Sequence, residues 1–176
     1  MTTRFINRKS LFTNPLFNVE EVQIEMPNKK QHRYQMVNHA DSVTILPVDE
    51  KGQIWFVSQY RVGANADLLE LPAGVIEKNE TPLACAEREV QEEIGMAARK
   101  IQPLGSFYLA PGYCNEVNHA FLARELFSSP LAQDEDEFLN INKLPIEQAY
   151  QMAQAGKIQD AKSLAALLLA RPLLLK

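Results

Sequence analysis

Short runs rich in apolar and β-branched residues recur over most of the chain, and this pattern is typical of β-strands. Turn residues such as Pro27 and Gly52 separate the runs. The segments with this pattern are 17–26, 29–39, 42–49, 53–61, 68–74, 100–110 and 117–126. Strands therefore dominate the predicted secondary structure.

Helical spacing appears in one segment near the middle and two near the end, at residues 82–94, 145–157 and 160–170. Thr81 is a good N-cap for the first helix, and Gly95 suits a left-handed C-cap. Gly156 ends the second helix, and Asp160 caps the third. This order predicts an α+β fold rather than regular βαβ alternation. A boundary near residue 40 divides an N-terminal β-strand region, 1–40, from a main domain, 41–176.

The middle helix carries two adjacent stripes. The apolar stripe consists of Leu83, Ala86, Val90 and Ile94. Glu89, Glu92 and Glu93 lie at i, i+3 and i+4, so they share a second face beside it. The sequence therefore predicts carboxylates at a rim, where the helix meets the body of the protein.

Like charges at this spacing destabilise a helix by roughly 0.2–0.5 kcal/mol per pair, so the cluster needs an explanation. One interpretation is a solvated acidic face with salt bridges to Arg88 or Lys78. The other is that divalent cations are the missing partners, because hard cations bind clustered carboxylate oxygens. A backbone carbonyl near Gly74, at the end of the preceding strand, would then complete the metal shell.

Composition narrows the classes of function. The chain has 176 residues, 46% of them hydrophobic, and a net charge of −4, which does not suggest a nucleic-acid binder. The apolar C-terminal stretch is interrupted by Arg171 and Pro172 and is too short to span a membrane. Cys85 and Cys114 have no metal-like spacing, and we expect reduced, non-catalytic thiols in a cytoplasmic protein. The N-terminus has no apolar core of a signal peptide.

Residues 74–96 resemble the Nudix hydrolase signature, G-x5-E-x7-R-E-U-x-E-E-x-G-U, in which U is aliphatic. The matching positions are Gly74, Glu80, Arg88, Glu89, Val90, Glu92, Glu93, Gly95 and Met96. The resemblance implies a mixed β-sheet sandwiched between helices, with a small N-terminal β-sheet region. It also implies a loop–helix–loop that binds divalent metal on the phosphates of a nucleoside diphosphate linked to another group.

Beyond the signature, residues 57–77, 104–123 and 156–170 and the acidic run 134–138 resemble the ADP-ribose pyrophosphatase branch of this family. The likeness implies hydrolysis of ADP-ribose to AMP and ribose 5-phosphate with Mg²⁺, for which Mn²⁺ is a possible substitute. The alternatives are hydrolysis of GDP-mannose or another nucleoside diphosphate sugar, and a non-catalytic nucleotide sensor. Sensors of this family usually lose signature glutamates, which this chain keeps.

The resemblance also implies roles for individual residues. The metal ligands it implies are the carbonyl of Ala73 and the carboxylates of Glu89, Glu92 and Glu93. The catalytic candidates are Glu92, Glu93, Glu135 and Glu137, with Asp134 and Asp136 as competitors in the acidic run. The substrate-binding candidates are Arg61, Val75 and Glu116. Arg61 has an alternative role in an ion pair with Glu70, and Asn115 departs from the Asp-Glu that many relatives carry beside Glu116. Arg88 and Glu80 are expected to form an ion pair that holds the loop to the helix.

The expected partners are a small nucleotide and a second copy of the chain, with no nucleic acid and no membrane. In relatives the N-terminal sheet contributes to a swapped homodimer, and a hairpin alone is marginally stable. Phe5, Phe12 and Phe17 are candidates for stacking the base.

Overall fold

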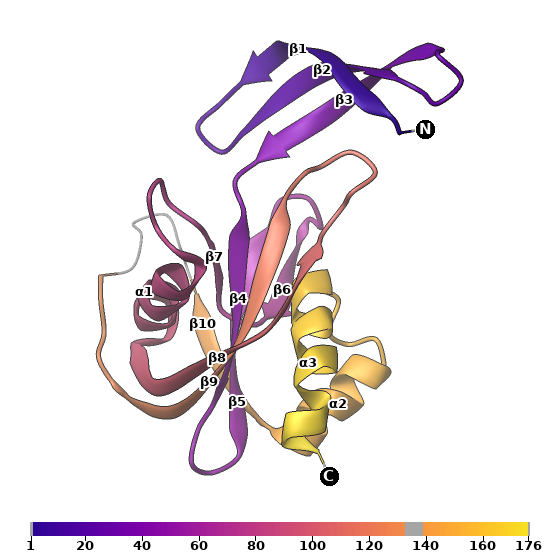
Figure 1. Cartoon of the computed structure of the whole chain (residues 1–176). Coiled ribbons are helices and arrows are strands. Elements are labelled where there is room, and N and C mark those ends of the chain that lie inside the picture. The colour runs from indigo at the N-terminus through magenta and orange to yellow at the C-terminus, as the bar shows by residue number, and fades with distance from the viewer. Residues whose placement is uncertain (1, 133–138, 176) are drawn as a thin grey trace. The chain divides into compact units, whose positions relative to one another are not determined.

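The computed structural model describes residues 2–132 and 139–175, and its chain separates into two compact units. The N-terminal unit contains residues 1–41 and 108–117, and the sheet–helix unit contains 42–107 and 118–176. Each unit has its own β-sheet, and the two are drawn in Figure 1.

The N-terminal unit is a three-stranded antiparallel sheet. Its strands are β1 (Arg4–Thr13), β2 (Phe17–Glu25) and β3 (Gln31–His39), in the order β1-β2-β3. Segment 108–117 joins this unit through Val37, whose N–H donates to Tyr113 O at 2.7 Å and whose carbonyl accepts from Asn115 N at 3.3 Å. Every residue of β1 is exposed, so this strand has no alternation of burial, and it lies outside the strands predicted from the sequence.

The sheet–helix unit is built on a mixed sheet in the order β10-β5-β4-β9-β8, with β6 paired to β5 and β7 to β4. Its strands are β4 (Ser42–Val48), β5 (Gln53–Arg61), β6 (Ala66–Glu70), β7 (Ala73–Val75), β8 (Met96–Tyr108), β9 (Val117–Ser128) and β10 (Asn140–Pro145). Strands β4 and β9 are parallel, whereas β4 pairs antiparallel with β5 and β7. Strand β10 was not predicted from the sequence.

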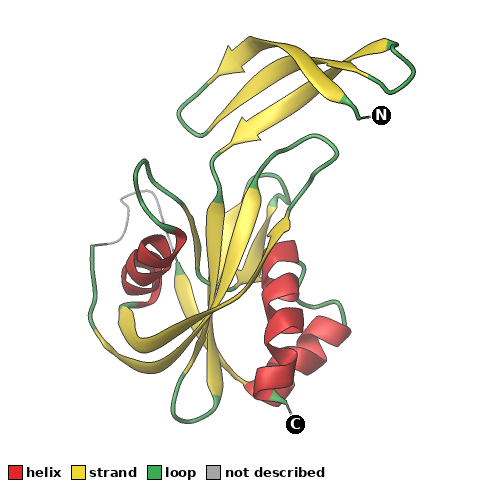
Figure 2. Ribbon diagram, in the orientation of Figure 1, coloured by secondary structure: helices red, strands yellow, loops and turns green. Residues whose placement is uncertain are grey.

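Helix α1 (Pro82–Ile94) covers one face of this sheet, and α2 (Ile146–Gln154) and α3 (Ala161–Leu174) cover the other (Figures 1 and 2). All seven residues of β4 are buried, because the strand has a helix layer on each side. Val43 and Ile45 pack in the cluster that includes α1, and Leu46 and Val48 pack in the cluster that includes α2 and α3. The predicted α+β class, a mixed sheet between helices with a small N-terminal sheet, is confirmed.

Local sequence chemistry sets the ends of α1 where they were predicted. The Thr81 hydroxyl accepts from Ala84 N at 3.2 Å, and Gly95 ends the helix with φ of 69°. Leu83 is 44% exposed, so its assignment to the apolar stripe was wrong. The buried face of α1 passes instead through Cys85, Ala86, Glu89, Val90, Glu93 and Ile94. Leu83 lies in the first turn at the margin of that face.

Among the described residues, no helix combines the length and the apolar character needed to cross a membrane.

Candidate active site

Two glutamates of α1 lie directly against the short strand β7. Ala73 N donates to Glu93 Oε2 at 3.1 Å. A Cβ atom on Gly74 would lie 1.8 Å from Glu89 Oε1, so the Glu89 carboxylate occupies the space that a side chain would fill. The glycine therefore leaves room for the Glu89 carboxylate between α1 and β7.

The burial of these carboxylates differs from the prediction of a rim. Glu89 is 8% exposed and Glu93 is 2% exposed, so both belong to the buried face of α1. Glu92 is intermediate. Buried carboxylates need bonds or charge partners, because desolvation of an unpaired charge costs several kcal/mol or more. The prediction failed because helical spacing gives the direction of a side chain and not the width of the surface that packs on it.

The pairing of β7 with β4 orients the backbone of Ala73. Ile45 N donates to Pro72 O at 2.8 Å, and Thr44 is the register partner of Ala73. Hydrogen-bonded and non-hydrogen-bonded pairs alternate in an antiparallel ladder. The N–H and C=O of Ala73 therefore point away from β4, which agrees with the bond from Ala73 N to Glu93.

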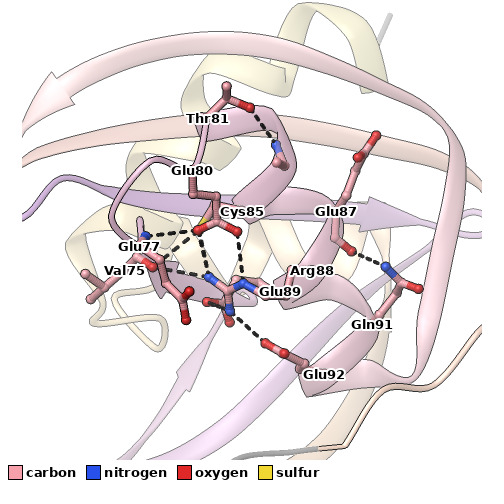
Figure 3. A network of polar contacts seen from close by, with 11 residues as sticks. Val75, Glu77, Glu80, Thr81, Cys85, Glu87, Arg88, Glu89, Gln91 and Glu92 are labelled. Carbon is pink, nitrogen blue, oxygen red and sulfur yellow. Dashed lines mark hydrogen bonds and ion pairs between the residues drawn. The ribbon is translucent and has the colours of Figure 1, made fainter.

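Arg88 is the central cation of the site (Figure 3). Its Nε and one terminal nitrogen bond the two oxygens of Glu80 at 3.0 and 3.1 Å, as expected for the ion pair between loop and helix. Its other terminal nitrogen bonds Glu89 Oε1 and Glu92 Oε2, both at 2.7 Å. The terminal nitrogen that bonds Glu80 also donates to Val75 O at 3.3 Å. The hydrogen bond from Arg88 lowers the pKa of the Glu80 carboxyl and raises the pKa of the guanidinium.

The donor set fits a hard divalent cation. Its candidate ligands, carboxylate oxygens and a backbone carbonyl, are the kind that Mg²⁺ prefers. One guanidinium contacts three carboxylates, which leaves negative charge in surplus. In this ion-paired arrangement, no three His, Cys, Asp or Glu side chains within 2–132 and 139–175 are grouped as a metal site. Among the described contacts, Glu80, Glu89 and Glu92 gather around Arg88.

Arg61 forms a bidentate ion pair with Glu70. Its Nε and a terminal nitrogen donate to Glu70 Oε1 and Oε2 at 2.8 and 2.7 Å. The hydrogen bond to Glu70 raises the pKa of Arg61, and the negative charges of Glu70 and Glu93 add to the shift. Glu93 therefore lies near enough to Arg61 for its charge to act on the guanidinium. The structure brings Arg61, Glu70 and the carboxylate site into one region of the sheet–helix unit.

Of the remaining predicted residues, Val75 lies at the site: it ends β7, it is 42% exposed, and its carbonyl accepts from Arg88. Glu116 belongs to the N-terminal unit, where Glu116 Oε2 is 3.8 Å from His39 Nδ1. Glu135 and Glu137 lie outside the residues that the structure describes.

Sequence reasoning missed the first turn of α3. Lys162 Nζ bonds Glu70 Oε2 at 2.6 Å and Asp160 Oδ1 at 2.7 Å. The Ser163 hydroxyl accepts from Leu71 N at 2.7 Å. The sequence marked Asp160 as a helix cap, but nothing in it indicated contacts with Glu70 and Leu71, which lie 92 positions before Lys162 and Ser163. Cys85 contacts Arg88, and burial raises the pKa of its thiol, which argues against a thiolate nucleophile there.

Comparison with known proteins agrees with this geometry. The NUDIX domain family matches residues 38–167. The ADP-ribose pyrophosphatase of Bacillus subtilis (strain 168) is 33% identical over 160 residues, 90% of this chain and 86% of the relative. A GDP-mannose pyrophosphatase of Enterobacter sp. (strain 638) is 28% identical over 174 residues, 90% of each chain. A solved ADP compounds hydrolase superposes with a TM-score of 0.88 at 25% identity, over 99% of this chain and 95% of that chain.

The fold and the carboxylate helix are those of a Nudix enzyme. The chain belongs to the NUDIX family, and the predicted likeness to its ADP-ribose pyrophosphatase branch is confirmed.

Proposed function

We propose that this protein is a metal-dependent pyrophosphatase that cleaves ADP-ribose to AMP and ribose 5-phosphate. The observation that carries the proposal is the contact of β7 with α1, where Glu89 fills the space beside Gly74 and Glu93 accepts from Ala73 N. This contact gathers carboxylates beside a backbone carbonyl that points away from β4. Similarity to an ADP-ribose pyrophosphatase over 90% of the chain supports the choice of substrate.

In this proposal the metal ligands are Glu89, Glu92, Glu93 and the carbonyl of Ala73. Bound Mg²⁺, or Mn²⁺ in its place, supplies neutralisation of the diphosphate charge and a more acidic water. The ions would meet the surplus negative charge that Arg88 alone leaves.

The general base and the substrate contacts are also part of the proposal. A carboxylate takes the proton of the attacking water, and the candidates are Glu92, Glu93, Glu135 and Glu137. Arg61 and Val75 bind the substrate, and Glu70 holds the Arg61 guanidinium in place. Glu116, which belongs to the N-terminal unit, stays a substrate-binding candidate from the sequence alone. The Arg88 guanidinium bonds Oε2 of the half-buried Glu92, so Oε1 is the oxygen that would take the proton.

A panel of nucleoside diphosphate compounds tests the substrate. With Mg²⁺, ADP-ribose should give AMP and ribose 5-phosphate, seen by chromatography, with a higher kcat/KM than GDP-mannose. ATP should be cleaved hardly at all, because its extra charge lies unfavourably near the acidic helix. An equal or higher kcat/KM for GDP-mannose would move the chain to the class of its GDP-mannose-cleaving relative. Nucleotide binding without cleavage of any compound would favour the sensor alternative.

We also propose that the chain forms a homodimer through its N-terminal unit, and that it acts in the cytoplasm. Apolar side chains on the exposed strand β1 support the dimer, since Phe5, Ile6, Leu11 and Phe12 are each at least 42% exposed. An exposed apolar strand of this kind is typical of an interaction surface. Phe5, Phe12 and Phe17 remain candidates for stacking the base; the rings of Phe12 and Phe17 lie 6.4 Å apart.

Sedimentation tests the dimer. A dimer is expected at micromolar concentration, and deletion of residues 1–38 should give a monomer with reduced activity. The deletion also removes Val37, whose backbone pairs with segment 108–117. A monomeric full-length chain, or full activity after the deletion, would contradict the proposal.

A further inference from the structure

The first turn of α3 holds the backbone immediately before the carboxylate site. Ser163 is fully buried, and its hydroxyl oxygen accepts from Leu71 N at 2.7 Å. The same hydroxyl donates to Asp160 Oδ2 at 2.5 Å, and Ser163 N donates to that oxygen at 2.9 Å. Asp160 thus fixes the hydroxyl hydrogen, so that a lone pair of Ser163 Oγ faces Leu71 N.

A second contact from the same turn holds the neighbouring residue. Lys162 Nζ lies 2.6 Å from Glu70 Oε2 and 2.7 Å from Asp160 Oδ1. Glu70 is 1% exposed and also bonds Arg61. Residues 70 and 71 are therefore both anchored to α3, one through its side chain and one through its backbone.

The anchored backbone leads within two residues to the proposed metal ligands. Pro72 has no N–H, and its carbonyl accepts from Ile45 N at 2.8 Å. The next donor, Ala73 N, bonds Glu93 Oε2. The two N–H groups on either side of Pro72 are thus bonded by side chains from opposite layers of the unit, Ser163 of α3 and Glu93 of α1.

We propose that Ser163 is a positioning residue for the metal site, and that it sets the orientation of the Ala73 carbonyl and of Glu93 through Leu71 and Pro72. Only Pro72 separates Leu71 from Ala73, and its ring fixes one of the backbone angles that could otherwise absorb a shift at Leu71. The inference rests on the proposed function, because the site that Ser163 positions is the divalent-cation site of that proposal. Asp160 and Lys162 keep Ser163 in place.

A purely structural role for Ser163 predicts something different. In that case its bond to Leu71 only fastens α3 to the sheet, and losing it lowers stability without changing the affinity for metal. Tyr150 offers a matched control, because its hydroxyl also makes a buried bond that holds α3, to Leu167 O at 2.7 Å. That bond joins α2 to α3 and does not involve Leu71.

The test is Mn²⁺ binding by the full-length protein without substrate, measured by calorimetry for the wild type, Ser163→Ala and Tyr150→Phe. Both variants should unfold at lower temperature. Ser163→Ala should weaken Mn²⁺ binding by about tenfold, as loss of an outer-shell partner commonly does. Tyr150→Phe should leave the Mn²⁺ affinity unchanged. Unchanged affinity in Ser163→Ala, or an equal loss in both variants, would overturn the inference.

Kinetics and a second variant complete the test. The Mg²⁺ concentration for half-maximal activity should rise in Ser163→Ala, while the substrate KM at saturating Mg²⁺ stays near that of the wild type. Ser163→Thr, which keeps the hydroxyl, should reach half-maximal activity at the same Mg²⁺ concentration as the wild type. If Ser163→Ala does not fold, Asp160→Asn, which disturbs the orientation of the hydroxyl, should weaken Mn²⁺ binding in the same direction, and normal affinity there would overturn the inference.

The wild type separates this inference from the proposed function. If it binds Mn²⁺ but cleaves none of the nucleoside diphosphate compounds, the proposed function fails, and the Mn²⁺ comparison still decides the role of Ser163. If the wild type cleaves ADP-ribose and Ser163→Ala matches its Mn²⁺ affinity, only the inference fails. A wild type that binds no Mn²⁺ overturns both.

Discussion

The Arg88 guanidinium contacts three carboxylates, whereas the Glu70 carboxylate is shared by two cations. The first group, Arg88 with Glu80, Glu89 and Glu92, is the box cluster. The second group, Glu70 with Arg61, Lys162 and Asp160, is the brace cluster. Both lie in the sheet–helix unit and both contain buried carboxylates.

The two clusters differ in charge balance. In the brace cluster two cations face two carboxylates, so the formal charges cancel and each group has an opposite charge within bonding distance. In the box cluster one cation serves three carboxylates, and Glu93 is buried on the same helix. A balanced cluster holds elements together, whereas a surplus of negative charge favours a further cation. The same residue types therefore support two roles, depending on their ratio.

The largest expected effect is the loss of activity when Glu89 of the box cluster or the neighbouring Glu93 is replaced. Glu93→Gln and Glu89→Gln should each lower turnover with Mg²⁺ by at least about two orders of magnitude, as loss of a charge-stabilising group commonly does. Thermal unfolding should change little or shift upward, since a repulsion is removed. Glu87→Gln, an exposed acid on the same helix, is the control. Near-normal turnover in both site variants would show that these carboxylates do not hold a metal ion needed for activity.

In the brace cluster the expected effect is on stability. Glu70→Ala leaves Arg61 and Lys162 without their shared carboxylate. The free energy of unfolding should fall by about 3 kcal/mol, the low end for breaking a buried pair, because both cations keep some exposure. Urea unfolding measures the change, and Glu87→Ala is the control for loss of an exposed glutamate. A fall no larger than that of the control would remove the distinction between the clusters.

Gly74→Ala separates activity from stability at the box cluster. The added methyl group would lie 1.8 Å from Glu89 Oε1, so the carboxylate must turn away from its position in the site. The cost in stability is small, because only the end of a flexible side chain has to move. Activity should fall by about tenfold, a typical effect of disturbing the support of a metal ligand. The free energy of unfolding should change by less than about 1 kcal/mol.

Gly63→Ala is the matched control for that variant, because nothing lies within 4 Å of a Cβ at Gly63. Equal activities of the two alanine variants would contradict the role given to the contact between Gly74 and Glu89.

The smallest expected effect is on the pH dependence of stability. Burial alone would raise the pKa of the Glu70 carboxyl, but bonds and charge from Arg61 and Lys162 outweigh it and hold the pKa below the ordinary 4.5. The stabilisation is therefore present above pH 4.5 and is lost as pH falls through the lower pKa of the folded state. In urea unfolding, Glu70→Gln should lose less stability than the wild type over that acid range. Parallel losses would show that Glu70 is not held ionised by the brace cluster.

Much of the fold followed from local chemistry. The Thr81 cap and the left-handed Gly95 gave the bounds of α1 as Pro82–Ile94, and an apolar run after a turn gave β5 as Gln53–Arg61. Strands β1 and β10 escaped prediction: every residue of β1 is exposed, and no residue of β10 is buried. Such edge segments become strands through pairing with a neighbour, which their own sequence does not indicate.

By itself the sequence determined the class of fold, the family and the carboxylates of the site, because each depends on residue types at short spacing. Only the tertiary structure decided that Glu89 and Glu93 are buried, that Arg61 and Lys162 share Glu70, and that Ser163 bonds Leu71. The tertiary structure likewise placed segment 108–117 in the N-terminal unit, where it pairs with Val37. These contacts join residues far apart in the chain, and they depend on how layers of the fold pack, which no local pattern encodes.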